Sequence, residues 1–145
     1  MKISIGSDHG GFELKQILSK RLADSGNEVL DRGNFSPEPV DYPDIAAEVS
    51  KDVVENRADR GILICGTGIG MCNSASRFRR ITTALCTNSY MAKMSRLHNN
   101  ANILCLGGRV VGNELAWEIS KAFLENEPIM NEKYIRRRKK VDSLP

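Results

Sequence analysis

Short strand-like runs alternate with amphipathic segments of helix length along the whole chain, and this alternation constrains the fold more than any other feature. Strands joined by helices in this way form parallel βαβ units with right-handed crossovers. We therefore expect an α/β protein: one three-layer α/β/α, Rossmann-like domain over residues 1–145, with a five-stranded parallel sheet. The expected strands lie at 2–6, 28–31, 61–65, 81–86 and 101–107, and the last expected helix, which is basic, lies at about 131–140.

Length and hydropathy place the chain in the class of ordinary folded proteins. Its 145 residues suit one domain, since domains typically have about 100–200 residues. The longest apolar runs, at 62–65 and 103–106, are too short for a bilayer, which needs about 20 apolar residues. The first residues lack the apolar stretch of a signal peptide. We expect a cytoplasmic protein with no membrane partner.

The four cysteines do not have the spacing of a metal site or a redox motif. Cys65, Cys72, Cys86 and Cys105 contain no C-x-x-C pair, and neither histidine lies at zinc spacing from them. The simplest interpretation is reduced thiols in a reducing compartment. The sequence thus predicts no metal and no cofactor.

Positive charge is concentrated at the C-terminal end. The net charge is +3, but residues 129–145 hold six basic and two acidic residues, which leaves the first 128 residues with a net charge of −1. The run Arg136–Lys140 is either a solvated or nucleic-acid-facing helix or a clamp for a small anion such as phosphate. No interleaved aromatic residues or known nucleic-acid signature accompany it, which favours the small anion and excludes nucleic acid as the expected partner.

A glycine-rich loop at residues 66–70 follows the most apolar expected strand and precedes a helix. Alternate glycines allow several backbone N–H groups to point at one anion, and the following helix adds its positive dipole end. The loop lacks the Gly-Lys-[Ser/Thr] of a P-loop, and its glycine spacing differs from that of a dinucleotide fingerprint. The glycines alone are equally consistent with a tight turn and with an anion cradle.

Cys65 is the last residue of the strand that leads into this loop. A thiol close to a helix N-terminus and several N–H groups can ionise near neutral pH, and the thiolate can then act as a nucleophile or as a base. Buried packing of a small hydrophobic side chain is the alternative. Both interpretations stay open at this stage.

Other polar residues are expected at or near the carboxyl ends of the strands, where ligands bind in such sheets. Each of these residues also has an ordinary explanation. The histidines could be solvated, and Asp8 could be the N-cap of a helix. Arg109 could lie at the surface, and Tyr42 could belong to the core. Together they supply an acid, two imidazoles and a guanidinium around a thiol, which predicts an enzyme site. These residues are Asp8, His9, Tyr42, His98 and Arg109.

Five motifs extend this interpretation, because together they resemble one family. They lie at 6–15 (GSDHGGFELK), 41–43 (DYP), 61–70 (GILICGTGIG), 95–99 (SRLHN) and 107–112 (GGRVVG). In order and spacing they resemble the sugar-phosphate isomerases of the ribose/galactose family, and within it the ribose-5-phosphate isomerases of type B. The resemblance covers nearly the whole chain. It implies metal-free interconversion of ribose 5-phosphate and ribulose 5-phosphate through an enediolate.

The resemblance also implies the catalytic roles. Cys65 would be the base that moves a proton between C2 and C1 of the sugar, and His98 would be the acid that assists opening of the furanose ring. The anion hole for the enediolate would be formed by Gly66, Thr67, Gly68, Ile69 and Gly70. The family forms dimers, sometimes tetramers, with sites at the subunit interface, so a homodimer or homotetramer is expected here.

Contacts to the rest of the sugar phosphate are implied in the same way. Asp8 and Asn99 would hold sugar hydroxyls, and Tyr42 would help to enclose the sugar. His9, Arg109 and cations of the C-terminal helix would bind the phosphate. The family pattern Arg-His-x-x-Arg-Val aligns best with Arg136 and Lys140 in the phosphate positions, although a slip in register would choose Arg137 or Arg138.

One departure assigns the chain to a branch of the family. Some members use a glutamate base at the position of Met71 and lack the loop cysteine, and methionine cannot abstract a proton. This chain therefore resembles the cysteine branch. Two alternatives remain: an isomerase of the same family acting on allose 6-phosphate or galactose 6-phosphate, and a non-catalytic nucleotide- or RNA-binding module.

Overall fold

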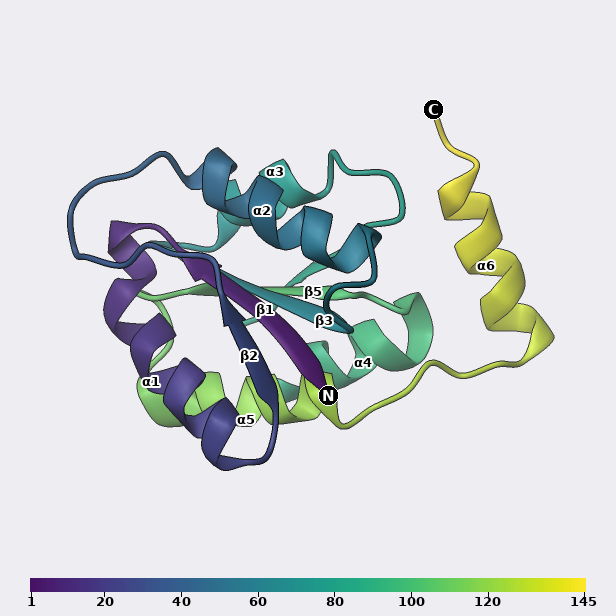
Figure 1. Ribbon diagram of the computed structural model, residues 1–145. Coiled ribbons are helices and arrows are strands. Elements are labelled where there is room, and N and C mark those ends of the chain that lie inside the picture. The colour runs from purple at the N-terminus through teal and green to yellow at the C-terminus, as the bar shows by residue number, and fades with distance from the viewer.

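A computed structural model describes all 145 residues and confirms the expected fold class (Figure 1). Five strands form one sheet in the order β2-β1-β3-β5-β4, and every neighbouring pair is parallel. The two last strands are shorter than expected at one or both ends. The strands are β1 (Lys2–Ser7), β2 (Glu28–Asp31), β3 (Arg60–Cys65), β4 (Thr83–Leu85) and β5 (Ile103–Gly107).

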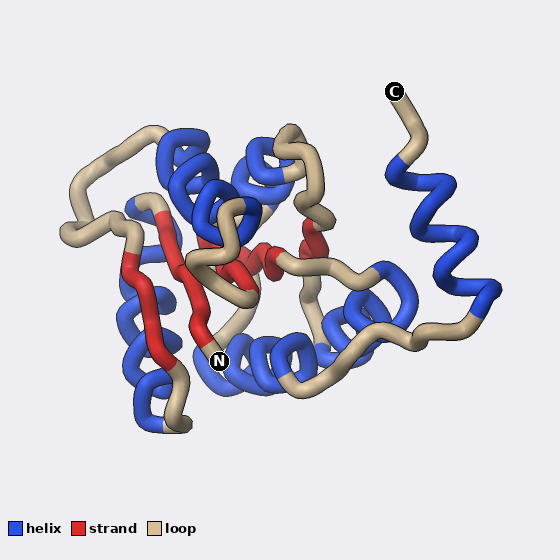
Figure 2. Tube along the Cα trace, turned by 45° about the vertical axis from the view of Figure 1, so that its right-hand side comes forward, coloured by secondary structure: helices blue, strands red, loops and turns tan.

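Helices cover both faces of this sheet, which gives the three layers (Figure 2). Strand β3 shows how the layers are held together: Ile62 and Ile64 belong to one apolar cluster, and Leu63 and Cys65 belong to the other, because side chains alternate along a strand. The first cluster includes residues of α1 (Phe12–Asp24), α4 (Ser89–Asn99) and α5 (Asn113–Leu124). The second includes residues of α2 (Tyr42–Val54) and α3 (Ile69–Ala75).

The order of the strands places the switch point of the sheet between β1 and β3, and we call the position beyond their carboxyl ends the crevice. These strands are neighbours, with Ser7 paired to Ile64 near their carboxyl ends. After β1 the chain enters a short 3-10 helix, η1 (His9–Gly11), and then α1 on one face, whereas after β3 it enters α3 on the other face. The two connections diverge at this point, which is where ligands bind in open parallel sheets.

Helix α6 (Glu132–Asp142) matches the expected basic helix and stands apart from the rest of the fold (Figures 1 and 2). None of its residues is buried. It lies beside α4, at the edge of the molecule from which the strands start, opposite the crevice. No helix of the structure combines the length and apolar character that crossing a bilayer demands.

Candidate active site

Cys65 ends β3 at the crevice, with its side chain on the side of the sheet covered by α2 and α3. Its exposed fraction is 5%. The backbone N–H of Gly68 donates a hydrogen bond to Cys65 Sγ at 3.1 Å. An N–H directed at sulfur stabilises negative charge there. The thiol therefore has the electrostatic partner that a thiolate base needs.

The loop after Cys65 requires glycine at position 68. Gly68 has a φ of +81° and forms the N-cap of α3, and a Cβ there would lie 2.9 Å from the backbone carbon of Leu106. The same left-handed turn directs the Gly68 N–H back at the sulfur. The N–H of Ile69 donates to Thr67 Oγ1 at 3.3 Å. Residues 66–70 thus form a tight turn that directs one backbone donor, the Gly68 N–H, at the thiol.

Tyr42 lies against this loop. The sequence left open whether this residue belongs to the core or to the wall of a ligand site. It begins α2 and is 41% exposed. Its ring covers Gly70: a Cβ at Gly70 would lie 2.8 Å from Tyr42 Cε2. The ring is therefore a wall beside the loop and not a core side chain.

Asp8 and His9 follow β1 on the other side of the crevice. Asp8 is 7% exposed, and its Oδ1 accepts a hydrogen bond from the Gly10 N–H at 2.8 Å, which caps η1. Asp8 therefore caps this short 3-10 helix, whereas the N-cap of α1 itself is Gly11. Asp8 Oδ2 accepts no hydrogen bond within the chain and is free to bind a ligand hydroxyl. The turn after β1 brings Asp8 close to the glycine loop, because a Cβ on Gly10 would lie 2.8 Å from the nitrogen of Gly66.

Arg109 follows β5 and lies beside the glycine loop. Its N–H donates to the carbonyl oxygen of Gly66 at 3.0 Å, and its Nη1 would lie 3.5 Å from a Cβ on Gly66. No carboxylate of the chain forms an ion pair with it. We call these residues of the crevice the carboxyl-edge cluster: Asp8, His9, Tyr42, Cys65, Gly66, Thr67, Gly68, Ile69, Gly70 and Arg109.

His98 and Asn99 do not join this cluster, so the expectation that both histidines surround the thiol is wrong for a single chain. They end α4, and the chain then enters β5 at Ile103. Cys65 lies across from Gly107, the last residue of β5. The length of β5, about 13 Å at roughly 3.3 Å per residue, separates the two ends. The sequence predicts His98 at or near the carboxyl end of a strand, and the structure places it instead at the end of α4, before the amino end of β5.

His98 instead pairs with a residue that the sequence analysis missed. The rings of His98 and Tyr134 stack at 4.7 Å between centroids, and Tyr134 Oη lies 3.2 Å from His98 Nε2. The only signal in the sequence is that Tyr134 is the one aromatic residue within α6. The contact joins positions 36 residues apart, which no local pattern indicates.

Two arginines of α6 complete this second group. A cavity of about 260 Å³ is lined by His98, Asn99, Tyr134, Arg137 and Arg138, among others. Arg138 donates to the carbonyl oxygens of His98 and Ile129, whereas no atom of the chain accepts a hydrogen bond from the Arg137 side chain. We call His98, Asn99, Tyr134, Arg137 and Arg138 the amino-edge cluster. Arg136 and Lys140 line a different, shallower groove together with Glu132 and Lys139.

One further thiol lies beside the glycine loop. Cys72 is on α3, and its sulfur is 3.1 Å from Thr83 Oγ1. Hydrogen bonds with Cys105 and Thr83 lower the pKa of the Cys72 thiol to about 6, against burial, which raises it. Burial raises the pKa of the Cys86 thiol to about 11. Nowhere do three His, Cys, Asp or Glu side chains gather as a metal site would require.

Residues 3–143 match the sequence model of one family, described as Ribose/Galactose Isomerase. The chain belongs to the ribose/galactose isomerase family. Both clusters lie inside the matched residues, so both are parts of the family's own domain.

Individual relatives support this assignment. The ribose-5-phosphate isomerase B of Escherichia coli K12 is 46% identical over 123 residues, which are 85% of this chain and 83% of the relative. A D-erythrulose-4-phosphate isomerase of Pectobacterium atrosepticum is 39% identical over 131 residues, 88% of this chain and 84% of the relative. The structure of Clostridium thermocellum ribose-5-phosphate isomerase B superposes with a TM-score of 0.96 at 48% identity, covering 98% of this chain and 95% of that one.

Proposed function

We propose that this isomerase interconverts ribose 5-phosphate and ribulose 5-phosphate by metal-free proton transfer. The observation that carries the proposal is the hydrogen bond from the Gly68 N–H to Cys65 Sγ at the crevice between β1 and β3. This hydrogen bond joins a candidate base to the glycine loop. The chain belongs to a family of aldose–ketose isomerases, for which such a base is required. The free cysteines of the chain suit a reducing compartment, and we place the enzyme in the cytoplasm.

The chemistry follows from these groups. The Cys65 thiolate removes the proton from C2 of the open-chain aldose, and the electron pair moves through C1 to O1 to form an enediolate. Backbone N–H groups of Gly66–Gly70, with the Thr67 hydroxyl, stabilise the negative oxygen, as aimed donors do for developing charge. Within the enediolate the proton of the O2 hydroxyl passes to O1, so that the negative charge moves to O2. The thiol then returns its proton to C1 while O2 becomes the carbonyl oxygen. The sulfur ends in its starting state.

We infer that two copies of the chain build one site. The carboxyl-edge cluster holds the proposed base Cys65, with His9 assigned to the phosphate, and the amino-edge cluster holds His98, the proposed ring-opening acid. Apolar side chains around α6 lie exposed, with Met130 and Leu144 each 70% exposed. A homodimer, alone or paired into a tetramer, in which His98 and Asn99 of one chain face Cys65 of another supplies both groups.

The groups that would bind the phosphate also come from both chains. His9 and Arg109 would come from the chain that supplies Cys65, and a cation of α6 from the other. Arg137 is the α6 cation that shares the cavity of His98 and makes no hydrogen bond within the chain. It fits better than Arg136 and Lys140, the pair favoured by sequence alignment, which face another groove. Asp8 and Asn99 hold hydroxyls in this arrangement, and Tyr42 encloses the sugar.

A coupled assay after exhaustive chelation tests the reaction. We expect isomerisation of ribose 5-phosphate at an undiminished rate after metal removal, and loss of turnover on chelation would overturn the metal-free mechanism. Substrate choice has a second candidate, because one relative is a D-erythrulose-4-phosphate isomerase. Parallel rates on erythrose 4-phosphate, allose 6-phosphate and galactose 6-phosphate decide it. Salt-sensitive nucleic-acid binding without isomerisation would instead support a binding module.

A further inference from the structure

We propose that Arg96, which touches no part of the crevice, is a positioning residue that holds His98 and Asn99 in their catalytic geometry. The proposal rests on the ring-opening role given to His98 above. Arg96 lies two residues before His98 on α4, and its side chain is fully buried. It is the largest fully buried side chain of the protein.

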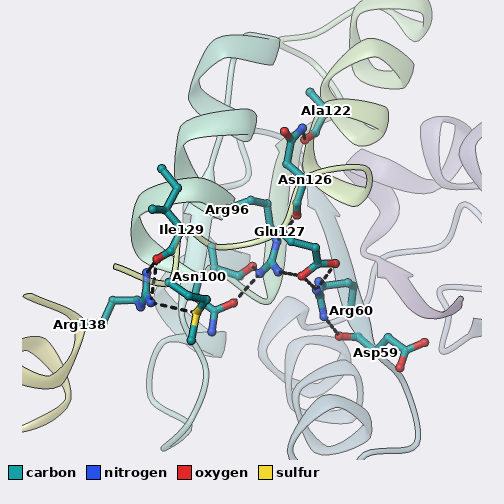
Figure 3. Close-up of polar contacts among 11 residues, drawn as sticks. Asp59, Arg60, Arg96, Asn100, Ala122, Asn126, Glu127, Ile129 and Arg138 are labelled. Atoms are coloured by element: carbon teal, nitrogen blue, oxygen red, sulfur yellow. Dashed lines mark hydrogen bonds and ion pairs between the residues drawn. The ribbon is translucent and has the colours of Figure 1, made fainter. Parts of the chain in front are cut away.

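The guanidinium of Arg96 binds acceptors from two separate segments, residues 100–101 and 126–127 (Figure 3). Its Nε donates to the carbonyl oxygen of Asn126 at 3.1 Å, and its Nη1 donates to Asn100 Oδ1 at 3.0 Å and to the carbonyl oxygen of Ala101. Its Nη2 is 3.3 Å from Glu127 Oε2, which also accepts from Arg60. The side chain therefore joins the end of α4, the approach to β5, and the connection that leads from α5 to α6.

This arrangement is costly, because burying a cation is unfavourable unless its donors are satisfied. Burial, together with the nearby charge of Arg60, lowers the pKa of Arg96 to about 10, so the side chain is still a cation at neutral pH. Its only carboxylate partner, Glu127, is 70% exposed. Apolar residues often stabilise such a position as well as a buried ion pair does. Stability alone therefore does not explain an arginine here, whereas a precise backbone geometry does.

The backbone that Arg96 holds is the one that carries His98. Helix ends fray because their last carbonyl groups lack partners within the helix. Here Asn100 adopts the left-handed conformation with a φ of 53°, and Arg96 fixes its side chain. On the outer side, the Ile129 N–H donates to the carbonyl oxygen of Leu97 at 2.9 Å, and Arg138 Nη1 donates to the carbonyl oxygen of His98. Arg138 also donates to the carbonyl oxygen of Ile129 (Figure 3). Arg96 therefore holds the end of α4 from inside the molecule, and Arg138 and Ile129 hold it from the outer side.

Two reactions, one of ribulose 5-phosphate and one of ribose 5-phosphate, distinguish mispositioning of His98 from general damage to the enzyme. Ribulose 5-phosphate cannot close a furanose ring, because its O5 carries the phosphate, so exchange of its C1 proton with D₂O needs Cys65 but no ring chemistry. Net isomerisation of ribose 5-phosphate needs ring opening as well. For Arg96→Lys we expect kcat/KM on ribose 5-phosphate to fall about 10- to 100-fold, as a misplaced catalytic group does. The exchange rate, measured by NMR, should fall less than about threefold.

The matched control is Arg60→Gln. Arg60 shares Glu127 with Arg96 but makes no hydrogen bond to α4, so both rates should stay within about twofold of the wild type. Asn100→Gly keeps the left-handed backbone and removes one acceptor of Arg96, and it should show the same split at a smaller size. This second variant carries the test if Arg96→Lys does not fold.

Each outcome decides between the two proposals. Equal losses in both reactions, or no loss in either, would overturn the positioning role of Arg96. His98→Asn should show the largest split of all. Absence of a split in His98→Asn would overturn the ring-opening role itself, whereas a split there without one in Arg96→Lys would overturn only the inference about Arg96.

Discussion

The carboxyl-edge and amino-edge clusters are built in different ways. Apart from Tyr42 on α2, the first gathers residues that end or directly follow strands β1, β3 and β5, and its contacts run mainly through backbone turns. The second is assembled from the end of α4 and a helix more than thirty residues later, and its contacts run through side chains such as His98 and Tyr134. The difference teaches that Cys65, the proposed base, is held by sheet topology and that His98, the proposed ring-opening acid, is held by tertiary contacts.

The largest effect should come from removing the base. For Cys65→Ala we expect kcat to fall about 1,000-fold, the range typical of a lost general base, with binding of ribose 5-phosphate retained. The coupled assay and isothermal titration measure the two quantities. Cys86→Ala is the matched control, because Cys86 is equally buried but lies in the other apolar cluster. Comparable losses in both variants would refute the assignment of Cys65.

Mixing two inactive variants tests whether one site needs both clusters from different chains. Cys65→Ala and His98→Asn, unfolded and refolded together, form heterodimers in which one site carries both substitutions and the other carries neither. We expect activity to recover to about a quarter of the wild-type value, the statistical share of intact sites in a twofold-symmetric dimer. If each chain held a complete site of its own, mixing would restore nothing.

The glycine loop can be altered without touching the sulfur. Gly68→Ala places a Cβ 2.6 Å from Leu85 Cδ1 at a φ of +81°. We expect a loss of about 3 kcal/mol in unfolding free energy and about 100-fold in kcat, because the turn that directs the N–H at Cys65 is displaced. Gly26→Ala has a similar φ of +87° but open space around it, and should cost only about 1 kcal/mol with normal activity. Equal kcat values for the two variants would count against the anion hole.

The phosphate cation can be assigned by a pair of substitutions on α6. Arg137→Ala should raise KM about 10- to 100-fold with little change in stability, since it removes a charged hydrogen bond to the ligand. Arg136→Ala, in the other groove, should change KM less than about twofold. The reverse result would establish the register favoured by sequence alignment, with Arg136 and Lys140 on the phosphate.

The smallest effect concerns Cys72 beside the loop. In a Cys65→Ala background, alkylation of Cys72 by iodoacetamide should rise through pH 6, where its thiolate forms, while Cys86, with a pKa of about 11, stays unreactive. The folded pKa of Cys72 lies below its ordinary value of 9.0, so its contribution to stability is present above pH 9 and is lost as the pH falls through 6. Mass spectrometry of the alkylated peptides measures how the alkylation of Cys72 and of Cys86 depends on pH.

The sequence by itself determined the alternation of strands and helices, the glycine loop after β3, and the candidates at the carboxyl edge. These features depend on local spacing: a residue that ends a strand lies at the edge of the sheet, and a left-handed turn requires glycine. The position of His98 opposite the thiol, its stacking on Tyr134 and the burial of Arg96 were decided only by the tertiary structure. The physical reason is that the free carbonyl groups at the end of α4 find donors in segments distant along the chain, and no local pattern specifies such partners.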